Sequence, residues 1–408
     1  MSNLLKKVRE KGLKDSVRMV SVKIKKTEKF DKQNLSSNRN VAFQKIVGHD
    51  YKSVIIFENH FGYYNIMLQR PQHITRELSD EDTLVIYNSY YDVDYRNYER
   101  ITEIKPHCYV MDLFYYREAL LRFLRTKHIK KTLMVYSTDT VPLHRIQQYE
   151  KEEFRILYEY VDDINPDLIS PKKLDMVLNR HSYLLNSEYT EIVATASRLY
   201  QNILNQNEKA NVELISNGVE CKKFPREMKT SDEEYLSWLR ADKIKMGYYG
   251  ALANWVDYDL LKKLVDDEAF QLILIGVEHD SSLRDSGILQ RNNVMYFGKK
   301  PYDQLAGYVH YFDICIIPFV INDITKATSP VKLFEYMAMG KPVITTPMPE
   351  CMKYDTVEIA SNVEEFREKV YRAVKKSKSE QYINALVECA YQNDWKEKAN
   401  EIKHKFSI

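Results

Sequence analysis

Residues 328–344, with the sequence TSPVKLFEYMAMGKPVI, contain the strongest structural signal in the chain. Ser329 is a favourable helix N-cap, and Pro330 suits the first helical position. Gly340 can adopt the left-handed conformation that ends a helix. The apolar run that begins at Pro342 is typical of a buried strand. This segment therefore predicts a short helix followed by a strand, the repeating unit of an α/β sheet.

A similar alternation of strands and helices begins near residue 53, which favours parallel sheets covered by helices. The 408 residues suffice for two such domains, and the polar stretch 217–242 would link them. We expect strands at 53–57, 83–87, 108–111, 132–136, 154–159, 182–185, 212–215, 244–248, 271–275, 293–296, 314–318, 342–345 and 357–359. We expect helices at 69–78, 115–127, 188–204, 257–267, 330–339, 362–376 and 380–391.

Composition excludes several classes of protein. Lys and Arg number 60 against 58 Asp and Glu, so no overall charge bias points to nucleic acid. Five cysteines without a C-x-x-C pair argue against a disulfide framework and a zinc site, and they fit a reducing cytoplasm. No apolar run approaches the length of a membrane span, and the start lacks a secretory signal. We therefore expect a cytoplasmic protein, either soluble or peripheral on the membrane.

The predicted helix at 330–339 suggests an anion site. Its free N–H groups would lie beyond the carboxyl edge of strand 314–318, where ligands bind in open α/β sheets. Lys332 and Glu335 are three residues apart and therefore share one helix face. Lys332 suits a phosphate, and Glu335 suits the hydroxyls of a ribose. The alternative is an ordinary capped helix with a surface Lys–Glu pair.

The run SPVKLFEYMAMGKPVITTPMPE resembles the donor-binding signature of the retaining, glycogen-synthase-like glycosyltransferases of the GT-B fold. Residues 247–251 (GYYGA) resemble the glycine turn that opens their C-terminal domain, and 217–219 (NGV) the turn that closes their N-terminal domain. Residues 70–73 (RPQH) and 158–163 (YEYVDD) resemble a bacterial subgroup that builds cell-wall and capsular polysaccharides. The resemblance implies two Rossmann-like, doubly wound α/β domains that face a cleft.

The resemblance also implies roles for residues of the predicted helix. Glu335 matches the glutamate that holds the donor ribose, and Ser329, Pro330 and Lys332 lie where the donor phosphates approach. One departure concerns the E-x7-E pattern of the family, because Ala327 stands in place of its first glutamate. The usual group near the transferred sugar is therefore absent.

Further donor contacts are expected from glycine-containing loops. Gly250 and Ala251 form the glycine turn, although the Arg and Lys that usually follow it are missing. Lys326 and Lys332 are the substitutes available for binding the diphosphate. Gly62 would let a loop of the first domain approach the donor.

The resemblance suggests four parts of the chain. Residues 1–50 form a basic N-terminal extension, and 51–222 form a Rossmann-like acceptor domain. Residues 223–390 form a Rossmann-like nucleotide-sugar donor domain. Residues 391–408 form a C-terminal helix that crosses back to the acceptor domain, as is common in the family.

Candidate residues of the first domain follow its strands. Asp162 ends a strand pattern and is a candidate catalytic group, although a paired acid there also suits a helix cap or turn. His60, Arg70 and His73 are candidate acceptor-binding residues. The alternatives are a polar loop for His60, and capping or flanking of helix 69–78 for Arg70 and His73.

These observations predict an enzyme. It would transfer a glycosyl unit from a nucleotide sugar, with a UDP-sugar favoured, to a glycan or lipid-linked acceptor with retention at the anomeric carbon. Asp162, Lys332 and Glu335 would carry the catalytic roles without a metal or cofactor. The alternatives are a nucleotide-sugar epimerase of the same fold and a catalytically weak partner subunit. The missing glutamate favours the partner subunit.

Residues 1–33, with eleven Lys or Arg and four Asp or Glu, could bind an anionic membrane surface.

Overall fold

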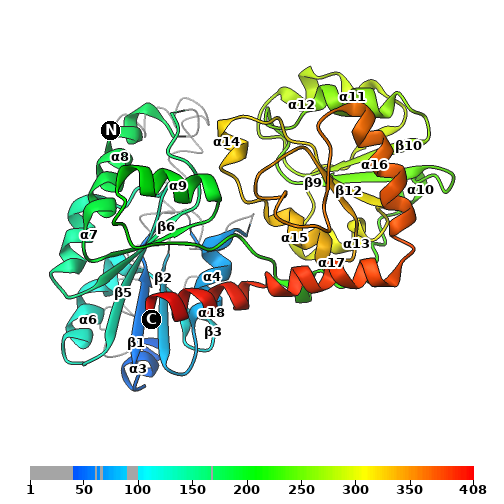
Figure 1. The fold of residues 1–408 in the computed structure, drawn as a ribbon. Coiled ribbons are helices and arrows are strands. Elements are labelled where there is room, and N and C mark those ends of the chain that lie inside the picture. Colours follow the sequence, from blue (N-terminus) through cyan, green and yellow to red (C-terminus); the bar gives the residue numbers. More distant parts are fainter. Residues whose placement is uncertain (1–39, 60–61, 65–67, 90–99, 167–168) are drawn as a thin grey trace, which may run out of the picture.

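The computed structural model describes residues 40–59, 62–64, 68–89, 100–166 and 169–408 (Figure 1). The predictions for the basic segment 1–33 and for His60 lie outside these residues. The described chain forms two parallel α/β sheets that lie side by side, each covered by helices. The prediction of a doubly wound α/β fold is therefore confirmed.

The first sheet has eight strands in the order β3-β4-β2-β1-β5-β6-β7-β8. All neighbours are parallel except β3 and β4. The order places β1 between β2 and β5, so the direction of winding reverses between β1 and β5. The strands are β1 (Ser53–Phe57), β2 (Thr83–Asn88), β3 (Ile101–Lys105), β4 (Cys108–Met111), β5 (Lys130–Tyr136), β6 (Arg155–Tyr160), β7 (Thr190–Ala194) and β8 (Val212–Leu214).

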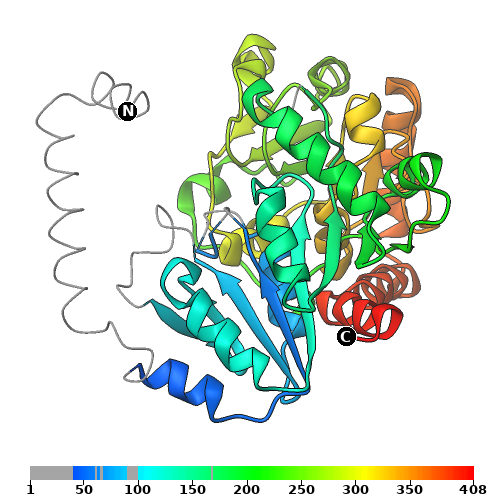
Figure 2. The same ribbon diagram turned by 90° about the vertical axis from the view of Figure 1, so that its left-hand side faces the viewer.

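Helices cover both faces of the first sheet, and β1 shows why (Figure 2). Its five residues are all buried, with Val54 and Ile56 in one apolar cluster and Ile55 and Phe57 in another. Continuous apolar strands of this kind are typical of parallel sheets covered on both sides. The covering helices are α3 (Val41–Val47), α6 (Leu113–Arg125), α7 (Leu143–Glu150), α8 (Pro171–Asn186) and α9 (Ser197–Gln206) on one face, with α4 (Arg70–Leu78) and α18 (Trp395–Phe406) on the other.

The second sheet has six parallel strands in the order β11-β10-β9-β12-β13-β14. Its winding reverses between β9 and β12. The strands are β9 (Ile244–Tyr249), β10 (Phe270–Ile275), β11 (Val294–Tyr296), β12 (Ile314–Ile317), β13 (Val343–Thr345) and β14 (Glu358–Ile359). The helices are α10 (Glu233–Trp238), α11 (Tyr258–Val265), α12 (Ser282–Asp285), α13 (Leu305–Val309), α14 (Asp323–Lys326), α15 (Val331–Ala338), α16 (Val363–Lys376) and α17 (Glu380–Gln392), with 3₁₀ turns at Cys221–Lys223, Ile288–Gln290 and Tyr302–Gln304.

Two of the elements predicted in the first half are wrong. The run 182–185, predicted as a strand, lies inside α8, where Val177, His181, Leu184 and Leu185 are buried at helical spacing. The predicted helix 188–204 is instead β7 followed by α9. The short apolar run SYLL was ambiguous because helix and strand patterns agree over so few residues.

The C-terminal helix joins the two halves of the molecule. Asp394 accepts a hydrogen bond from Lys396 N as the N-cap of α18, and its backbone pairs with Val219. α18 then packs along α4 of the first domain (Figure 1). Its residues Trp395 and Ile402 belong to the apolar cluster beneath the first sheet. The last helix of the chain therefore completes the core of the first domain.

The segment 217–242, predicted as a linker, is partly structured. α10 lies within it, and Tyr235 is fully buried in the core of the second domain. Asp232 pairs with Lys300 at 2.7 Å. The polar composition was misleading here, because one buried aromatic ring and one ion pair suffice to attach the segment to the second sheet.

Candidate functional site

The start of α15 is organised by a tertiary contact instead of a local cap. Pro330 is the N-cap and Val331 is the first helical residue, so the predicted positions of Ser329 and Pro330 are each wrong by one residue. The Ser329 hydroxyl accepts a hydrogen bond from Asn217 N at 3.2 Å, and its carbonyl accepts one from Asn217 Nδ2 at 2.8 Å. Ser329 therefore binds the turn between the domains. Gly340 has φ +66°, which confirms the left-handed helix end.

Lys332 places an unpaired ammonium group at the switch point of the second sheet. Its Nζ lies 5.3 Å from the ring centre of Tyr248 and 4.9 Å from that of Phe319. It forms no ion pair or hydrogen bond with any residue that the structure describes. Desolvation lowers the pKa of Lys332 to about 8, although the nearby charge of Glu335 opposes the shift. A cation held in this way is available to an anionic ligand.

Gly250 makes room for this lysine. It follows β9 with φ +142°, a conformation that favours glycine. A Cβ atom at this position would lie 2.9 Å from Lys332 Cε and 3.3 Å from Lys332 Nζ. The carbonyl of Ala251 accepts a hydrogen bond from the Tyr248 hydroxyl at 2.9 Å, which fixes the turn. The glycine turn and Lys332, far apart in sequence, thus form one wall of the site.

Glu335 is buried and held by two tyrosines. It is only 3% exposed, and it accepts hydrogen bonds from the hydroxyls of Tyr249 and Tyr302, the latter at 2.8 Å. Burial raises the pKa of its carboxyl group above the ordinary value. The alternative of a surface Lys–Glu pair is therefore wrong. Each carboxylate oxygen has a second lone pair, so a ligand hydroxyl can still donate to Glu335.

Lys326 and Ala327 lie at the end of α14, away from this cluster of hydrogen bonds. Lys326 is partly exposed, and its ammonium group forms no hydrogen bond or ion pair with any described residue. Ala327 is 2% exposed and belongs to an apolar cluster of the first domain. A glutamate in place of Ala327 would be desolvated in this conformation. The departure from the E-x7-E pattern thus coincides with a contact between the domains.

Asp162 follows β6 at the carboxyl edge of the first sheet. The Ser137 hydroxyl donates to its carbonyl at 3.3 Å and accepts from its N–H at 3.4 Å, which fixes the backbone. The side chain is exposed, but surrounding protein and the neighbouring Asp163 raise its pKa to about 6. Asp163 instead accepts a hydrogen bond from the Tyr160 hydroxyl at 3.0 Å. With its pKa raised to about 6, the Asp162 carboxylate can accept a proton near neutral pH.

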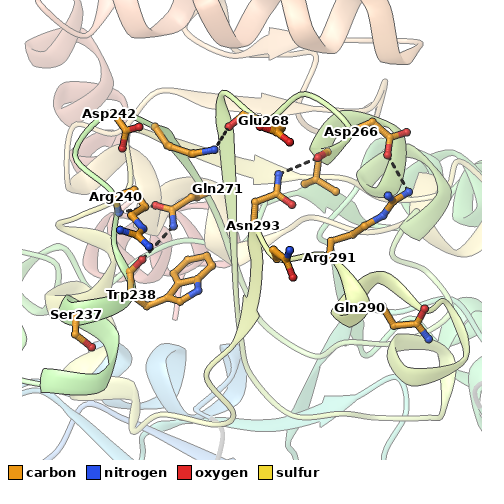
Figure 3. A pocket seen from close by; sticks show the side chains of 13 residues that line it. Ser237, Trp238, Arg240, Asp242, Asp266, Glu268, Gln271, Gln290, Arg291 and Asn293 are labelled. Carbon is orange, nitrogen blue, oxygen red and sulfur yellow. Dashed lines mark hydrogen bonds and ion pairs between the residues drawn. The ribbon is translucent and has the colours of Figure 1, made fainter.

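A cavity of about 720 Å³ lies elsewhere, at the amino ends of the strands of the second sheet (Figure 3). Trp238, Arg240 and Asn293 are among its lining residues, and Arg291 pairs there with Asp266 at 2.8 Å. None of the predicted site residues lines it. Ligands of open α/β sheets bind at the carboxyl ends of strands, so we place the candidate site at Lys332 and not in this cavity.

Comparisons with known proteins relate part of the chain to glycosyltransferases. Residues 247–376 match the family model of glycosyl transferases group 1. TuaH of Bacillus subtilis strain 168, assigned to teichuronic acid biosynthesis as a glycosyltransferase, is 26% identical over 160 residues. That match covers 38% of this chain and 39% of TuaH, so it spans about two fifths of that relative.

Solved structures resemble a larger part of the chain. Sucrose-phosphate synthase from Thermosynechococcus elongatus has a TM-score of 0.63 and 14% identity, covering 87% of this chain and 98% of that structure. Anabaena HepE, solved with UDP-glucose, has a TM-score of 0.59 and 12% identity, covering 87% and 99%. The chain has the GT-B fold.

In this GT-B structure, two predicted acceptor residues are buried at the junction of the domains. Arg70 is 1% exposed, forms an ion pair with Glu159 and donates to the carbonyl of Ser216 at 2.8 Å. His73 is 3% exposed and stacks on Trp395 with ring centres 5.2 Å apart, and desolvation lowers its pKa to about 3. The polar atoms of both side chains make internal contacts here, and acceptor binding by Arg70 and His73 stays a prediction.

Gly62 lies in a turn that is fixed on both sides. It has φ +76°, its N–H donates to Asn59 Oδ1 at 3.3 Å, and its carbonyl accepts from Gln72 Nε2 and the Tyr87 hydroxyl at 3.2 and 3.1 Å. Its N–H is therefore already used. A donor contact by Gly62 remains a prediction.

Sequence reasoning missed the tyrosines that hold Glu335. Tyr249 stands inside the quoted run GYYGA, and Tyr302 begins a 3₁₀ turn after β11. A tyrosine next to a glycine turn could have been noted as a hydrogen-bond donor. Nothing in the local sequence of Tyr302 indicates that it reaches Glu335, 33 residues away.

No helix in the described ranges is long and apolar enough to cross a membrane. No group of three or more His, Cys, Asp or Glu side chains is arranged there to hold a metal ion.

Proposed function

We propose that the protein is a glycosyltransferase that uses a nucleotide-sugar donor, with a UDP-sugar favoured. The unpaired ammonium of Lys332 beside Gly250 and the start of α15 carries this proposal. A helix N-terminus and a lysine together attract a diphosphate. The match of residues 247–376 to glycosyl transferases group 1 supports it, because that segment contains Gly250, Lys332 and Glu335.

The proposed reaction transfers the sugar with retention at the anomeric carbon. The acceptor oxygen bonds to that carbon, the bond from it to the diphosphate breaks, and the hydroxyl proton passes to Asp162 or to the departing phosphate oxygen. Lys332 and the first N–H groups of α15 stabilise the negative charge of the leaving diphosphate. Glu335, oriented by Tyr249 and Tyr302, accepts hydrogen bonds from the ribose. These groups act without a metal ion or cofactor.

The proposed acceptor is a glycan or a lipid-linked glycan of a surface polysaccharide. The partial similarity to TuaH, assigned to teichuronic acid biosynthesis, supports a cell-wall product. The likeness of the fold to HepE, solved with UDP-glucose, supports a UDP-sugar donor. We further propose that the enzyme works in the cytoplasm and contacts the membrane peripherally through residues 1–33.

A thermal-shift experiment with UDP and UDP-sugars tests the donor site. At about 100 times its dissociation constant, a ligand should stabilise the protein by roughly 2.7 kcal/mol. Glu335→Gln should weaken the response to UDP, whereas Ser286→Ala, a substitution remote from the site, should leave it unchanged. A wild-type protein that responds to no nucleotide or nucleotide sugar would contradict the proposal.

A catalytically weak partner subunit is the second candidate function. The burial of Ala327 against the first domain favours it, because the position of the missing glutamate is closed to a ligand here. Such a subunit would bind UDP but transfer no sugar by itself. Transfer by the purified chain alone would exclude this candidate.

A further inference from the structure

Three charged side chains from three different elements meet at the switch point of the first sheet. Glu58 directly follows β1, Arg117 lies in the first turns of α6, and Arg145 lies in the first turn of α7. Arg117 forms an ion pair with Glu58, and Arg145 Nε lies 3.7 Å from Glu58 Oε1. Two guanidinium groups thus share one carboxylate, and the cluster has one positive charge in excess.

Arg145 carries this excess charge toward solvent. Its side chain is 29% exposed, compared with 16% for Arg117 and 8% for Glu58. Arg117 donates to Glu58 and also to the Tyr149 hydroxyl at 3.4 Å. The guanidinium of Arg145 donates no hydrogen bond to any residue in the described part of the chain. Its planar set of N–H donors suits an oxyanion such as a carboxylate or phosphate.

An exposed aromatic ring lies on α6, the helix that carries Arg117. Phe114 is 83% exposed, and its ring centre lies 5.0 Å from that of Tyr115. Phe114 precedes Arg117 by three residues, so both project from neighbouring positions on one side of the helix. An apolar ring beside a polar group can cover the apolar face of a sugar while the charge binds its substituent. The combination fits an acidic sugar better than a free inorganic ion.

The cluster lies on the same sheet edge as Asp162. Glu58 follows β1 and Asp162 follows β6, with β5 between them in the sheet. Two strand spacings correspond to roughly 10 Å. An acceptor whose reacting hydroxyl lies at Asp162 could therefore extend along the edge to Arg145.

We infer that Arg145, held by Glu58 and Arg117, binds a carboxylate or phosphate group of the acceptor, which is therefore an acidic glycan. This inference rests on the proposed function and adds the chemical class of the acceptor. Glu58 and Arg117 are positioning residues, because they keep the Arg145 guanidinium at the switch point. Phe114 contributes the apolar contact to the sugar.

Calorimetric titration of the full chain, with UDP present, tests the inference. The probes are a glucuronate-containing tetrasaccharide, its carboxyl-reduced form and glucose 1-phosphate. Wild-type protein should bind the acidic tetrasaccharide at least about tenfold more tightly than the reduced form, as expected for a hydrogen-bonded charge pair. Binding of glucose 1-phosphate but not of the tetrasaccharide would assign the site to phosphate-bearing acceptors.

Arg145→Gln should abolish the preference for the acidic probe, and Arg145→Lys should retain part of it. Arg122→Gln, which removes an exposed arginine of α6 outside the cluster, is the matched control and should retain all of it. Arg117 is not substituted in this test, because its loss would leave the buried Glu58 carboxylate with Arg145 as its remaining, more distant partner. Thermal unfolding verifies that each variant is folded.

The two proposals fail in different ways. Equal binding of acidic and reduced probes by wild type, no binding of any probe, or a preference that survives in Arg145→Gln would overturn the inference about the acceptor. A thermal response to UDP that is retained in all these variants would leave the proposed function intact. Absence of the UDP response in wild type would instead contradict the proposed function.

Discussion

The two switch points of this molecule collect their charged groups in different ways. In the second sheet, Lys332 and Glu335 lie three residues apart on one helix, so a local pattern reveals both. In the first sheet, Glu58, Arg117 and Arg145 come from three separate elements, and no local pattern connects them. A donor common to many enzymes can be bound by a recurrent motif, whereas an acceptor site assembled from separate loops can change with each loop.

Burial distinguishes the charged side chains that hold the domains together from those that are available to a ligand. Arg70 stands in a recognisable run and is fully buried, whereas Arg145 stands in no motif and is partly exposed. The conspicuous arginine therefore serves the fold, and the inconspicuous one is available to a ligand.

The largest effect on stability is expected from Arg70→Ala. It leaves Glu159 buried without its partner, so the free energy of unfolding should fall by about 3–5 kcal/mol. Urea denaturation measures the change. Arg122→Ala, on the exposed surface of α6, should change it by no more than about 0.5 kcal/mol. Similar values for the two variants would mean that Arg70 is not a structural residue.

Lys332→Ala should reduce sugar transfer by roughly 10²–10³-fold, because it removes a preorganised charge at the leaving group. Initial rates with a saturating acceptor measure this loss. Lys326→Ala provides the comparison, since Lys326 lies at the end of α14. An equal loss in both variants would show that the two lysines share the diphosphate.

Gly250→Ala should weaken UDP binding by crowding Lys332 and should cost about 1–3 kcal/mol of stability through backbone strain. Gly298→Ala is the matched control. It also replaces a glycine of positive φ, but no atom lies within 4 Å of the added Cβ. Equal weakening of UDP binding in both variants would indicate that strain, and not the contact with Lys332, is responsible.

Affinity for UDP should fall as pH rises through about 8. The lowered pKa means that Lys332 is charged below this pH and neutral above it. The charged fraction, and with it the contribution of Lys332, should decrease about tenfold between pH 7 and pH 9. Titration of Lys332→Ala over the same range is the control. A wild-type profile parallel to that of the variant would remove Lys332 from the phosphate site.

Activity should fall as pH decreases through about 6. The raised pKa means that the carboxyl group of Asp162 becomes protonated in this range and can no longer accept a proton. For a single group the decrease is about tenfold between pH 7 and pH 5. Asp162→Asn should lose this dependence together with part of the activity. An acid limb that persists unchanged in Asp162→Asn must belong to another group.

Much of the second domain could be predicted from local sequence. The helix, the glycine turn and the positions of the strands along the chain follow from caps, glycines and apolar runs that act over a few residues. The error at Ser329 has a tertiary origin, because Asn217 occupies its hydroxyl and carbonyl. In the first domain, the run 182–185 is too short for helix and strand periodicity to be distinguished.

The sequence alone determined the α/β alternation, the helix end at Gly340 and the shared helix face of Lys332 and Glu335, because these depend on hydrophobic periodicity and on chemistry between near neighbours. Only the tertiary structure decided which charges are buried and which are available. Arg70 and His73 are hidden because the last helix of the chain, α18, returns to cover the first sheet. Arg145 and Asp162 remain accessible because parallel strands bring their loops to one sheet edge. Burial depends on contacts between distant segments, so it cannot be inferred from the identity of a side chain.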